Sequence, residues 1–251
     1  PLVVYVPEKL RAQSGLPAGR TCDRMVSLVD LGPTVLSLLD LPIPSYVQGR
    51  AFLGKAAREP RQYVFAVRDR IDEVPELSRA VRDSRYLYIR NYMPDLSWNQ
   101  PESYSDQLPL RREIARLAAA GRLNAPQLTY AGTTKPLEVL YDSEKDPWQL
   151  TNLAADPAMR PVLERMRKAL HGWQTENRDL GFIHEWQTRK MSGERPPSEA
   201  ARSDSTYPLE RVLDTAGRVG QPGEVREFIR RLSDPDPTVR YWAAMGLRVA
   251  G

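Results

Sequence analysis

Apolar residues follow two patterns in the first part of the chain. The run Leu2–Val6 is almost entirely apolar, which predicts a buried strand. Further on, helical spacing predicts a helix with one buried apolar face, made of Leu31, Val35, Leu38 and Leu39. Pro42 and Pro44 end this helix, because the residue before a proline avoids helical backbone. We therefore expect an α/β arrangement in this region.

The middle of the chain alternates strand-like and helix-like segments. Composition and alternation predict strands at Gln62–Val67, Arg79–Asp83, Arg85–Asn91 and Glu138–Asp142, the second and third forming a hairpin. Helices are expected at Leu110–Ala120, before Gly121, and from Asp156 to Gln174. The second of these has an apolar side made of Leu163, Met166, Leu170 and Trp173. This order predicts an α+β layer, in which a helix covers one face of a small antiparallel sheet.

The last part of the chain reads as a linker followed by helices. Thr188–Thr206 is rich in turn formers and nearly free of apolar residues. Glu224–Leu232 predicts an amphipathic helix with an apolar face of Val225, Phe228, Ile229 and Leu232. Asp236 and Pro237 then have the order of a helix cap and first helical residue. The following apolar face is Val239, Trp242, Ala243, Gly246 and Leu247, so an α-hairpin that begins a repeat array is expected.

Composition changes this picture little. The 251 residues include 22 prolines, which punctuate the chain, and the net charge is only +4. Basic pairs such as Arg111-Arg112 and Arg230-Arg231 are too short for a nucleic-acid stripe, although a mildly basic surface could attract a sulfated polysaccharide. No apolar stretch has the length of a membrane span. The single cysteine, Cys22, excludes an intrachain disulfide and leaves the compartment undetermined.

Several motifs resemble the alkaline-phosphatase-like sulfatases in order and spacing. The segment Arg24–Pro44, followed by Gln48-Gly49-Arg50, resembles a helix near the end of their catalytic domain. The segment Leu140–Leu153 is similar to the strand and turn of their C-terminal subdomain. Arg68–Glu73 with the following hairpin resembles a heparan-sulfamidase-like branch. Residues 236–247 resemble the helices of HEAT repeats.

The resemblance implies four segments. Residues 1–58 are expected to end a sulfatase catalytic domain, and residues 59–187 to form the C-terminal subdomain. Residues 188–206 are the expected linker, and residues 207–251 a truncated HEAT-like helical repeat. Because the chain opens at Pro1 inside a strand-like run, we expect a fragment of a longer protein. The resemblance implies that this parent protein is periplasmic or secreted.

The family's chemistry uses a formylglycine, made from Cys or Ser in a Cys-x-Pro-x-Arg setting, together with a calcium ion. Cys22 lacks this setting, because Arg24 and Val26 stand where the motif has Pro and Arg. We expect no catalytic residue and no metal site in this chain, with calcium and formylglycine in the parent protein. Pro1 is a candidate for the last residue of an upstream Gly-Gly-x-Arg-x-Pro motif.

The candidate substrate-binding residues are Arg68, Arg70, Asp72 and Glu73, in a loop after a buried strand. Arginine presents paired donors that match sulfate and carboxylate geometry. The alternative is an internal salt-bridge cluster that also includes Asp69 and pins the loop to the hairpin. His171 and His184 are interpreted as structural, since two isolated histidines make a poor zinc site.

Two functions stay open at this point. The first is a sulfatase fragment whose parent hydrolyses sulfate esters or N-sulfate on glycans. The second is a non-catalytic interaction module, in which HEAT-like helices bind a protein partner. A Cys-x-Pro-x-Arg motif upstream would favour the first.

Overall fold

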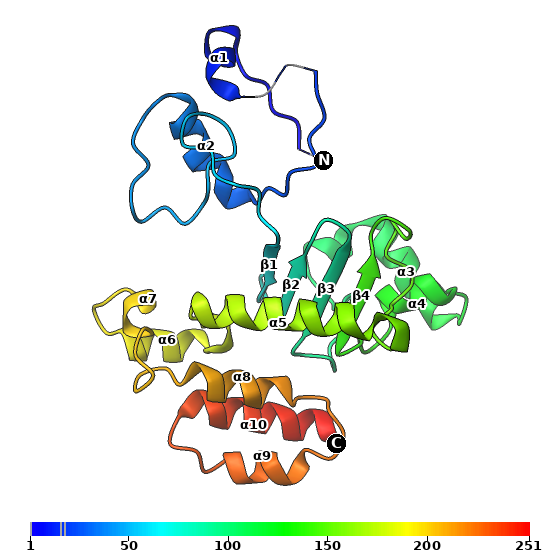
Figure 1. Ribbon diagram of the computed structural model, residues 1–251. Coiled ribbons are helices and arrows are strands. Elements are labelled where there is room, and N and C mark those ends of the chain that lie inside the picture. The colour runs from blue at the N-terminus through cyan, green and yellow to red at the C-terminus, as the bar shows by residue number, and fades with distance from the viewer. Residues whose placement is uncertain (1, 16, 18) are drawn as a thin grey trace. The chain divides into compact units, whose positions relative to one another are not determined.

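The computed structural model describes residues 2–15, 17 and 19–251, which divide into two compact units. The N-terminal unit comprises the residues up to Phe65 together with Arg82–Tyr86, and the C-terminal unit comprises Ala66–Val81 and Leu87–Gly251 (Figure 1). Within the described residues, none of the helices combines the length and apolar character that crossing a bilayer requires.

The N-terminal unit contains short helices and no strand at its start. Its elements are 3-10 helices at Glu8–Leu10 and Leu28–Asp30, α1 (Arg11–Ser14) and α2 (Leu31–Leu38). The expected buried strand at Leu2–Val6 is wrong: the segment is not in a sheet, and Val3 and Tyr5 are 89% and 78% exposed. A strand is stable only when a neighbouring strand satisfies its backbone, and no described strand pairs with it.

Helix α2 forms where expected but buries the opposite face. Pro33, Thr34 and Ser37 are buried, whereas Val35 and Leu39 are 54% and 49% exposed. The buried hydroxyls explain this orientation: Thr34 accepts from the Phe52 N–H at 3.1 Å, and Ser37 accepts from the Ala56 N–H at 3.0 Å. Hydrogen bonds to the following loop thus decide which side of α2 faces inward.

Asp30 is the electrostatic centre of this unit. Its carboxylate accepts from the N–H groups of Ser27 at 3.0 Å and Arg50 at 2.7 Å, and from the Arg61 guanidinium at 2.5 Å and 2.9 Å. Burial alone would raise the pKa of Asp30, but these hydrogen bonds outweigh burial and lower it. Gly49 is required beside this centre, because a Cβ there would collide with the Val29 carbonyl. The Gln48-Gly49-Arg50 step therefore has a packing reason.

The sheet of the middle region has the order β1-β2-β3-β4 and confirms the expected small antiparallel sheet with helices. Its strands are β1 (Val64–Arg68), β2 (Ser78–Arg82), β3 (Tyr86–Asn91) and β4 (Glu138–Asp142). Helix α5 (Arg160–Glu176) lies across one face and buries Leu163, Met166 and Leu170, as expected (Figure 1). Gln174 is buried in addition, while Trp173 is only half-buried. Between β3 and β4 come a 3-10 helix (Ser105–Gln107), α3 (Pro109–Ala119) and α4 (Ala125–Ala131).

The segment expected as a linker is folded. Residues 188–206 contain the end of α6 (Glu185–Ser192) and all of α7 (Pro197–Ala200). Ala201 is fully buried within the main apolar cluster. Arg178 holds the region down by donating to the carbonyls of Ala201 at 2.8 Å and Tyr207 at 2.6 Å. The sequence pattern missed this because the segment packs through small residues and backbone carbonyls, with Met191 as its single large apolar side chain against the cluster.

The C-terminal helices are α8 (Leu209–Gly217), α9 (Val225–Arg231) and α10 (Pro237–Ala250), with α10 packed on both others (Figure 1). Asp236 caps α10 as expected, accepting from the N–H groups of Thr238 at 2.9 Å and Val239 at 3.1 Å. The expected apolar face of α9 is largely wrong: Phe228 is buried, but Val225, Ile229 and Leu232 are exposed.

These helices share a core with the segment that precedes them. Trp242 donates from Nε1 to the Phe182 carbonyl at 2.9 Å, and its ring lies 5.7 Å from that of Phe182 and 6.4 Å from that of Tyr92. Tyr207 donates to the Asp179 carbonyl at 2.7 Å. The C-terminal helices therefore share one apolar cluster with Phe182, Ile183 and residues that flank strands β2 and β3.

Candidate functional site

Arg68 is the last residue of β1, and the other candidate residues lie in the connection between β1 and β2, within the C-terminal unit. Ile71 and Val74 exchange backbone hydrogen bonds of 3.0 Å and 2.8 Å and enclose a two-residue turn of Asp72 and Glu73. Asp72 has a φ of 48°, a left-handed conformation that aspartate tolerates better than most residues. Both side chains are exposed at the tip of this turn.

The base of the connection is anchored by Arg79. This β2 side chain is 1% exposed, and its guanidinium contacts both Asp179 oxygens at 2.6 Å and 2.9 Å and the Asp69 carboxylate at 2.7 Å. Burial alone would lower the pKa of Arg79, but the two carboxylates outweigh burial and raise it. Gly181 is required here, because a Cβ would collide with this guanidinium. Asp69 therefore belongs to an internal salt-bridge cluster, as the alternative interpretation held.

The four candidate residues differ in how far they are engaged. Glu73 accepts from the Ser103 N–H at 2.7 Å, and this hydrogen bond lowers the pKa of Glu73. Arg70 pairs with Glu185 at 3.1 Å, with both side chains more than half exposed. Arg68 and Asp72 make no side-chain hydrogen bond or ion pair in the part of the chain that the structure describes. Arg68 is thus the candidate whose donors are available to a ligand.

Sequence reasoning missed a buried ion pair beside Arg68. Lys135 and Glu76 form a salt bridge with both side chains fully buried, and Glu76 also accepts from the Leu77 N–H at 2.9 Å. Burial lowers the pKa of Lys135, opposed by Glu76, and the nearby charge of Arg68 lowers it further. The partners are 59 residues apart, so no local pattern indicated the pair.

The other singled-out residues contribute no comparable site. Cys22 is exposed, and its Arg20–Met25 setting does not fit a formylglycine precursor. His184 packs against Tyr241, with ring centroids 6.1 Å apart, and His171 lies 3.3 Å from Glu210, an acidic partner that the sequence did not indicate. Among the described residues, no three His, Cys, Asp or Glu side chains converge as a metal ion requires. Pro1 lies outside the described residues.

The chain is similar to curated sulfatases. It is 38% identical over 175 residues to an ulvan-active sulfatase of Formosa agariphila, a match that covers 70% of this chain and 28% of that protein. It is 28% identical over 193 residues to human N-sulphoglucosamine sulphohydrolase, covering 71% of this chain and 37% of that protein. About 70% of this chain is therefore homologous to sulfatases.

The match to known sulfatases covers only part of each relative. The chain spans only about a third of the length of these relatives. A solved 2-O GAG sulfatase matches with 21% identity and a TM-score of 0.39, over 69% of this chain and 28% of that one. No model of a known protein family matches the sequence.

Proposed function

We propose that this chain is the C-terminal part of a sulfatase whose parent protein hydrolyses sulfate esters or N-sulfate on glycans. The observation that carries the proposal is the 38% identity over 175 residues to an ulvan-active sulfatase. Because those residues are only 28% of that relative, the nucleophile and the calcium ligands are assigned to the part of the parent that precedes this chain. Calcium would neutralise the sulfate there, and formylglycine would supply the nucleophile.

Within this proposal the β1–β2 connection forms part of the substrate rim. Arg68 offers a free guanidinium whose donors match the oxygens of a sulfate or carboxylate on the glycan. Asp72 and Glu73 at the turn offer acceptors for sugar hydroxyls. The Arg79 cluster fixes the base of this loop, so the rim is held in place before the substrate arrives.

The exposed apolar side of α2 also supports a larger parent. Leu28, Val29, Val35, Leu39 and Leu41 are all exposed in the N-terminal unit. A patch of this kind on a folded protein usually marks a surface that another element covers. We assign its cover to the preceding part of the catalytic domain.

The test compares this chain with a protein extended upstream in the same reading frame, after co-expression with a formylglycine-generating enzyme. Sulfate release from sulfated glycans is measured with and without calcium. We expect calcium-dependent release from the extended protein and none from this chain. Release by this chain alone would overturn the proposal, and an extended frame without Cys-x-Pro-x-Arg would favour the interaction module.

The rim assignment has its own test in the extended protein. Arg68→Ala removes the free guanidinium, and a charged hydrogen bond contributes about 1.5–3 kcal/mol. We expect KM to rise roughly tenfold or more with a smaller change in kcat. Arg122→Ala is the matched control, since Arg122 is also exposed and its side chain makes no ion pair among the described residues. Equal KM values for the two variants would remove Arg68 from the rim.

A further inference from the structure

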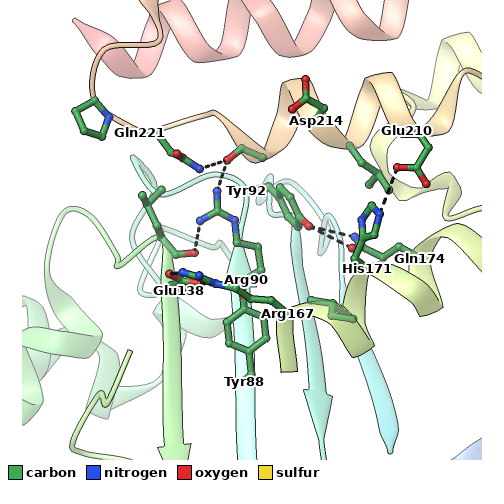
Figure 2. Close-up of a pocket in the computed structure, with 15 residues that line it drawn as sticks. Tyr88, Arg90, Tyr92, Glu138, Arg167, His171, Gln174, Glu210, Asp214 and Gln221 are labelled. Carbon is green, nitrogen blue, oxygen red and sulfur yellow. Dashed lines mark hydrogen bonds and ion pairs between the residues drawn. The ribbon is translucent and has the colours of Figure 1, made fainter. Parts of the chain in front are cut away.

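The C-terminal unit contains a cleft that the proposed chemistry does not use. It has a volume of about 740 Å³ and lies between the sheet, α5, α8 and the loop after α8 (Figure 2). Small-molecule sites usually measure roughly 300–1,000 Å³. Its lining contains cations, carboxylates, amides and tyrosines, and its charged members are Arg90, Arg167, Glu138, Glu210 and Asp214.

One carboxylate at the sheet side of the cleft is fully engaged. Glu138 accepts from Arg167 with both oxygens, the longer contact being 2.9 Å, and from the Tyr88 hydroxyl at 2.9 Å. Burial alone would raise the pKa of Glu138, but Arg167 and Tyr88 outweigh burial and lower it. Glu138 therefore stays charged and is neutralised by Arg167.

Arg90 adds a second cation on the same side. Its guanidinium donates to the carbonyls of Gly217 at 2.6 Å and Leu137 at 3.3 Å, and its Cζ lies 5.6 Å from the centroid of the Tyr92 ring (Figure 2). These hydrogen-bond partners are neutral, so Arg90 has no carboxylate hydrogen-bonded to it and three of its five N–H donors are uncommitted. With Arg167 and Glu138 already paired, this side of the cleft carries one unit of excess positive charge.

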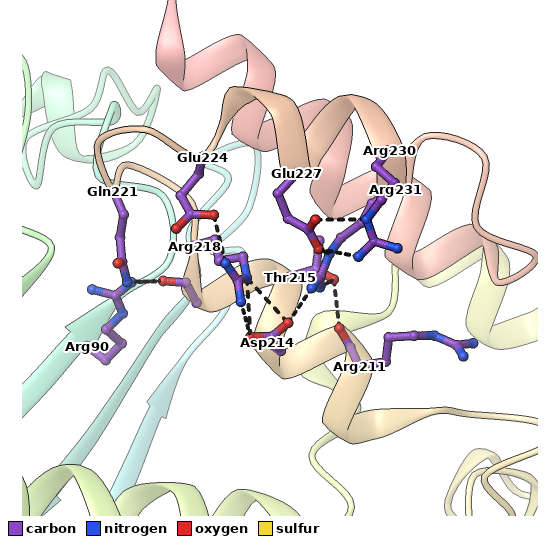
Figure 3. A network of polar contacts seen from close by, with 11 residues as sticks. Arg90, Arg211, Asp214, Thr215, Arg218, Gln221, Glu224, Glu227, Arg230 and Arg231 are labelled. Atoms are coloured by element: carbon purple, nitrogen blue, oxygen red, sulfur yellow. Dashed lines mark hydrogen bonds and ion pairs between the residues drawn. The ribbon is translucent and has the colours of Figure 1, made fainter.

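The α8 side of the cleft offers groups suited to hydroxyls. Glu210 lies 3.3 Å from His171, and both side chains are more than half exposed. Gln221 donates to the Gly217 carbonyl at 2.8 Å, which leaves its own amide oxygen as an acceptor. Asp214 forms ion pairs with Arg218 at 3.1 Å and with Arg231, so its charge is neutralised by these two arginines and not by Arg90 (Figure 3).

We propose that this cleft binds an acidic sugar unit, with its carboxylate or sulfate on Arg90 and its hydroxyls on Glu210 and Gln221. The anion preference rests on Arg90 and its neutral partners alone. The choice of a sugar as the ligand rests on the proposed function, in which the parent protein acts on glycans. The cleft would hold a glycan away from the reacting sulfate, as a second binding site on the same chain.

The experiment measures binding to this chain by NMR titration and calorimetry, without any assay of sulfate release. The probes are D-glucuronate, D-glucose 6-sulfate, D-glucose and inorganic sulfate. We expect the two acidic sugars to bind at least tenfold more tightly than glucose or sulfate alone. Shifts should appear at the amides around Gly217 and Leu137.

Two variants keep the test independent of folding. Arg90→Gln should weaken both acidic sugars at least tenfold and leave glucose unchanged. Gly217→Leu should fill part of the cleft and leave the Arg90 side chain in place. Gly217 lines the cleft, and a Cβ there meets no heavy atom within 4 Å. Gly172→Leu is the matched control: it is also a helical glycine with open space, but it does not line the cleft.

The outcomes separate this inference from the sulfatase proposal. Binding of glucose as tight as that of the acidic sugars, or of sulfate as tight as glucose 6-sulfate, would overturn the acidic-sugar site. Unchanged binding in Gly217→Leu, or no binding of either acidic sugar, would also overturn it. Sulfate release by the extended protein with no acidic-sugar binding here would leave the proposed function standing and reject only this site.

Discussion

Helix α2 of the N-terminal unit and helix α10 of the C-terminal unit bury opposite kinds of side chain. Helix α10 packs Val239, Trp242 and Ala243 into an apolar cluster. Helix α2 turns Thr34 and Ser37 inward, and its apolar residues Val35 and Leu39 face solvent. Apolar burial is the larger stabilising contribution in a folded domain, so the C-terminal unit has an internal source of stability that α2 lacks.

This difference shows that an amphipathic pattern predicts an apolar face to be buried, but does not predict which element packs against it. In α10 the cover comes from α8, α9 and the segment around Phe182. In α2 the loop that follows satisfies the hydroxyls and leaves the apolar side free. The free side is what the longer parent protein would have to cover.

The largest expected effect comes from truncating the two apolar faces in parallel. Trp242→Ala should lower the free energy of unfolding by about 3–5 kcal/mol, because it leaves a cavity in the shared core. Val35→Ala should change it by less than about 0.5 kcal/mol in this chain. Urea unfolding followed by circular dichroism measures both.

The effect of Val35→Ala should differ in the extended protein. There Val35→Ala should cost roughly 1–2 kcal/mol more than in this chain, if the preceding part of the domain covers α2. An unchanged, near-zero cost would contradict that cover.

A somewhat smaller effect, limited to the C-terminal unit, is expected from Arg79. Arg79→Met would leave Asp179 buried without its cation and should cost about 3 kcal/mol. Arg116→Ala is the control, because its pair with Glu113 is exposed and screened by solvent, so its loss should change the stability little. Amide hydrogen exchange should show faster exchange in the β1–β2 connection for Arg79→Met only. Similar exchange in both variants would reject Arg79 as the anchor.

The smallest expected effect is a pH dependence of the N-terminal unit. The folded pKa of Asp30 lies below its ordinary value of 3.8, so its contribution is complete above that value. As pH falls through the folded pKa, the carboxylate is protonated and the contribution is lost. Hydrogen exchange of α2 should therefore accelerate in acid.

Asp30→Asn is the variant that checks this pH dependence. At neutral pH it should cost about 1–3 kcal/mol of local stability, because the Arg61 guanidinium loses its charged partner. It should also remove the acid-dependent part of the acceleration in α2. An acid response identical to that of the unsubstituted chain would assign the effect to other carboxylates.

The sequence predicted elements whose signals are local. The hairpin of β2 and β3, the cap of α10 at Asp236 and the buried stripe of α5 lie where the pattern placed them. The four candidate residues do lie together at the end of β1 and in the β1–β2 connection, and the competing salt-bridge interpretation holds for Asp69. Whether Arg68 contacts substrate stays a prediction.

The failures have a common physical cause. Leu2–Val6 has the composition of a strand, but a strand needs a partner that composition does not supply. The segment 188–206 has only one large apolar residue, Met191, yet contacts from Arg178 to backbone carbonyls also hold it onto the core. In both cases the deciding contact comes from elsewhere in the chain.

Periodicity, turns and helix caps could be predicted from the sequence alone, because they depend on residues a few positions apart. The sequence also carries the homology to sulfatases over about 70% of the chain. The buried face of α2 became known only from the tertiary structure. The same holds for the contact of Arg79 with Asp179, which lies 100 residues further along the chain. The tertiary structure likewise brought Arg90 to the Gly217 carbonyl across 127 residues and left its charge facing a cleft. Such pairs form when folding brings distant segments together, and no local spacing in the chain records them.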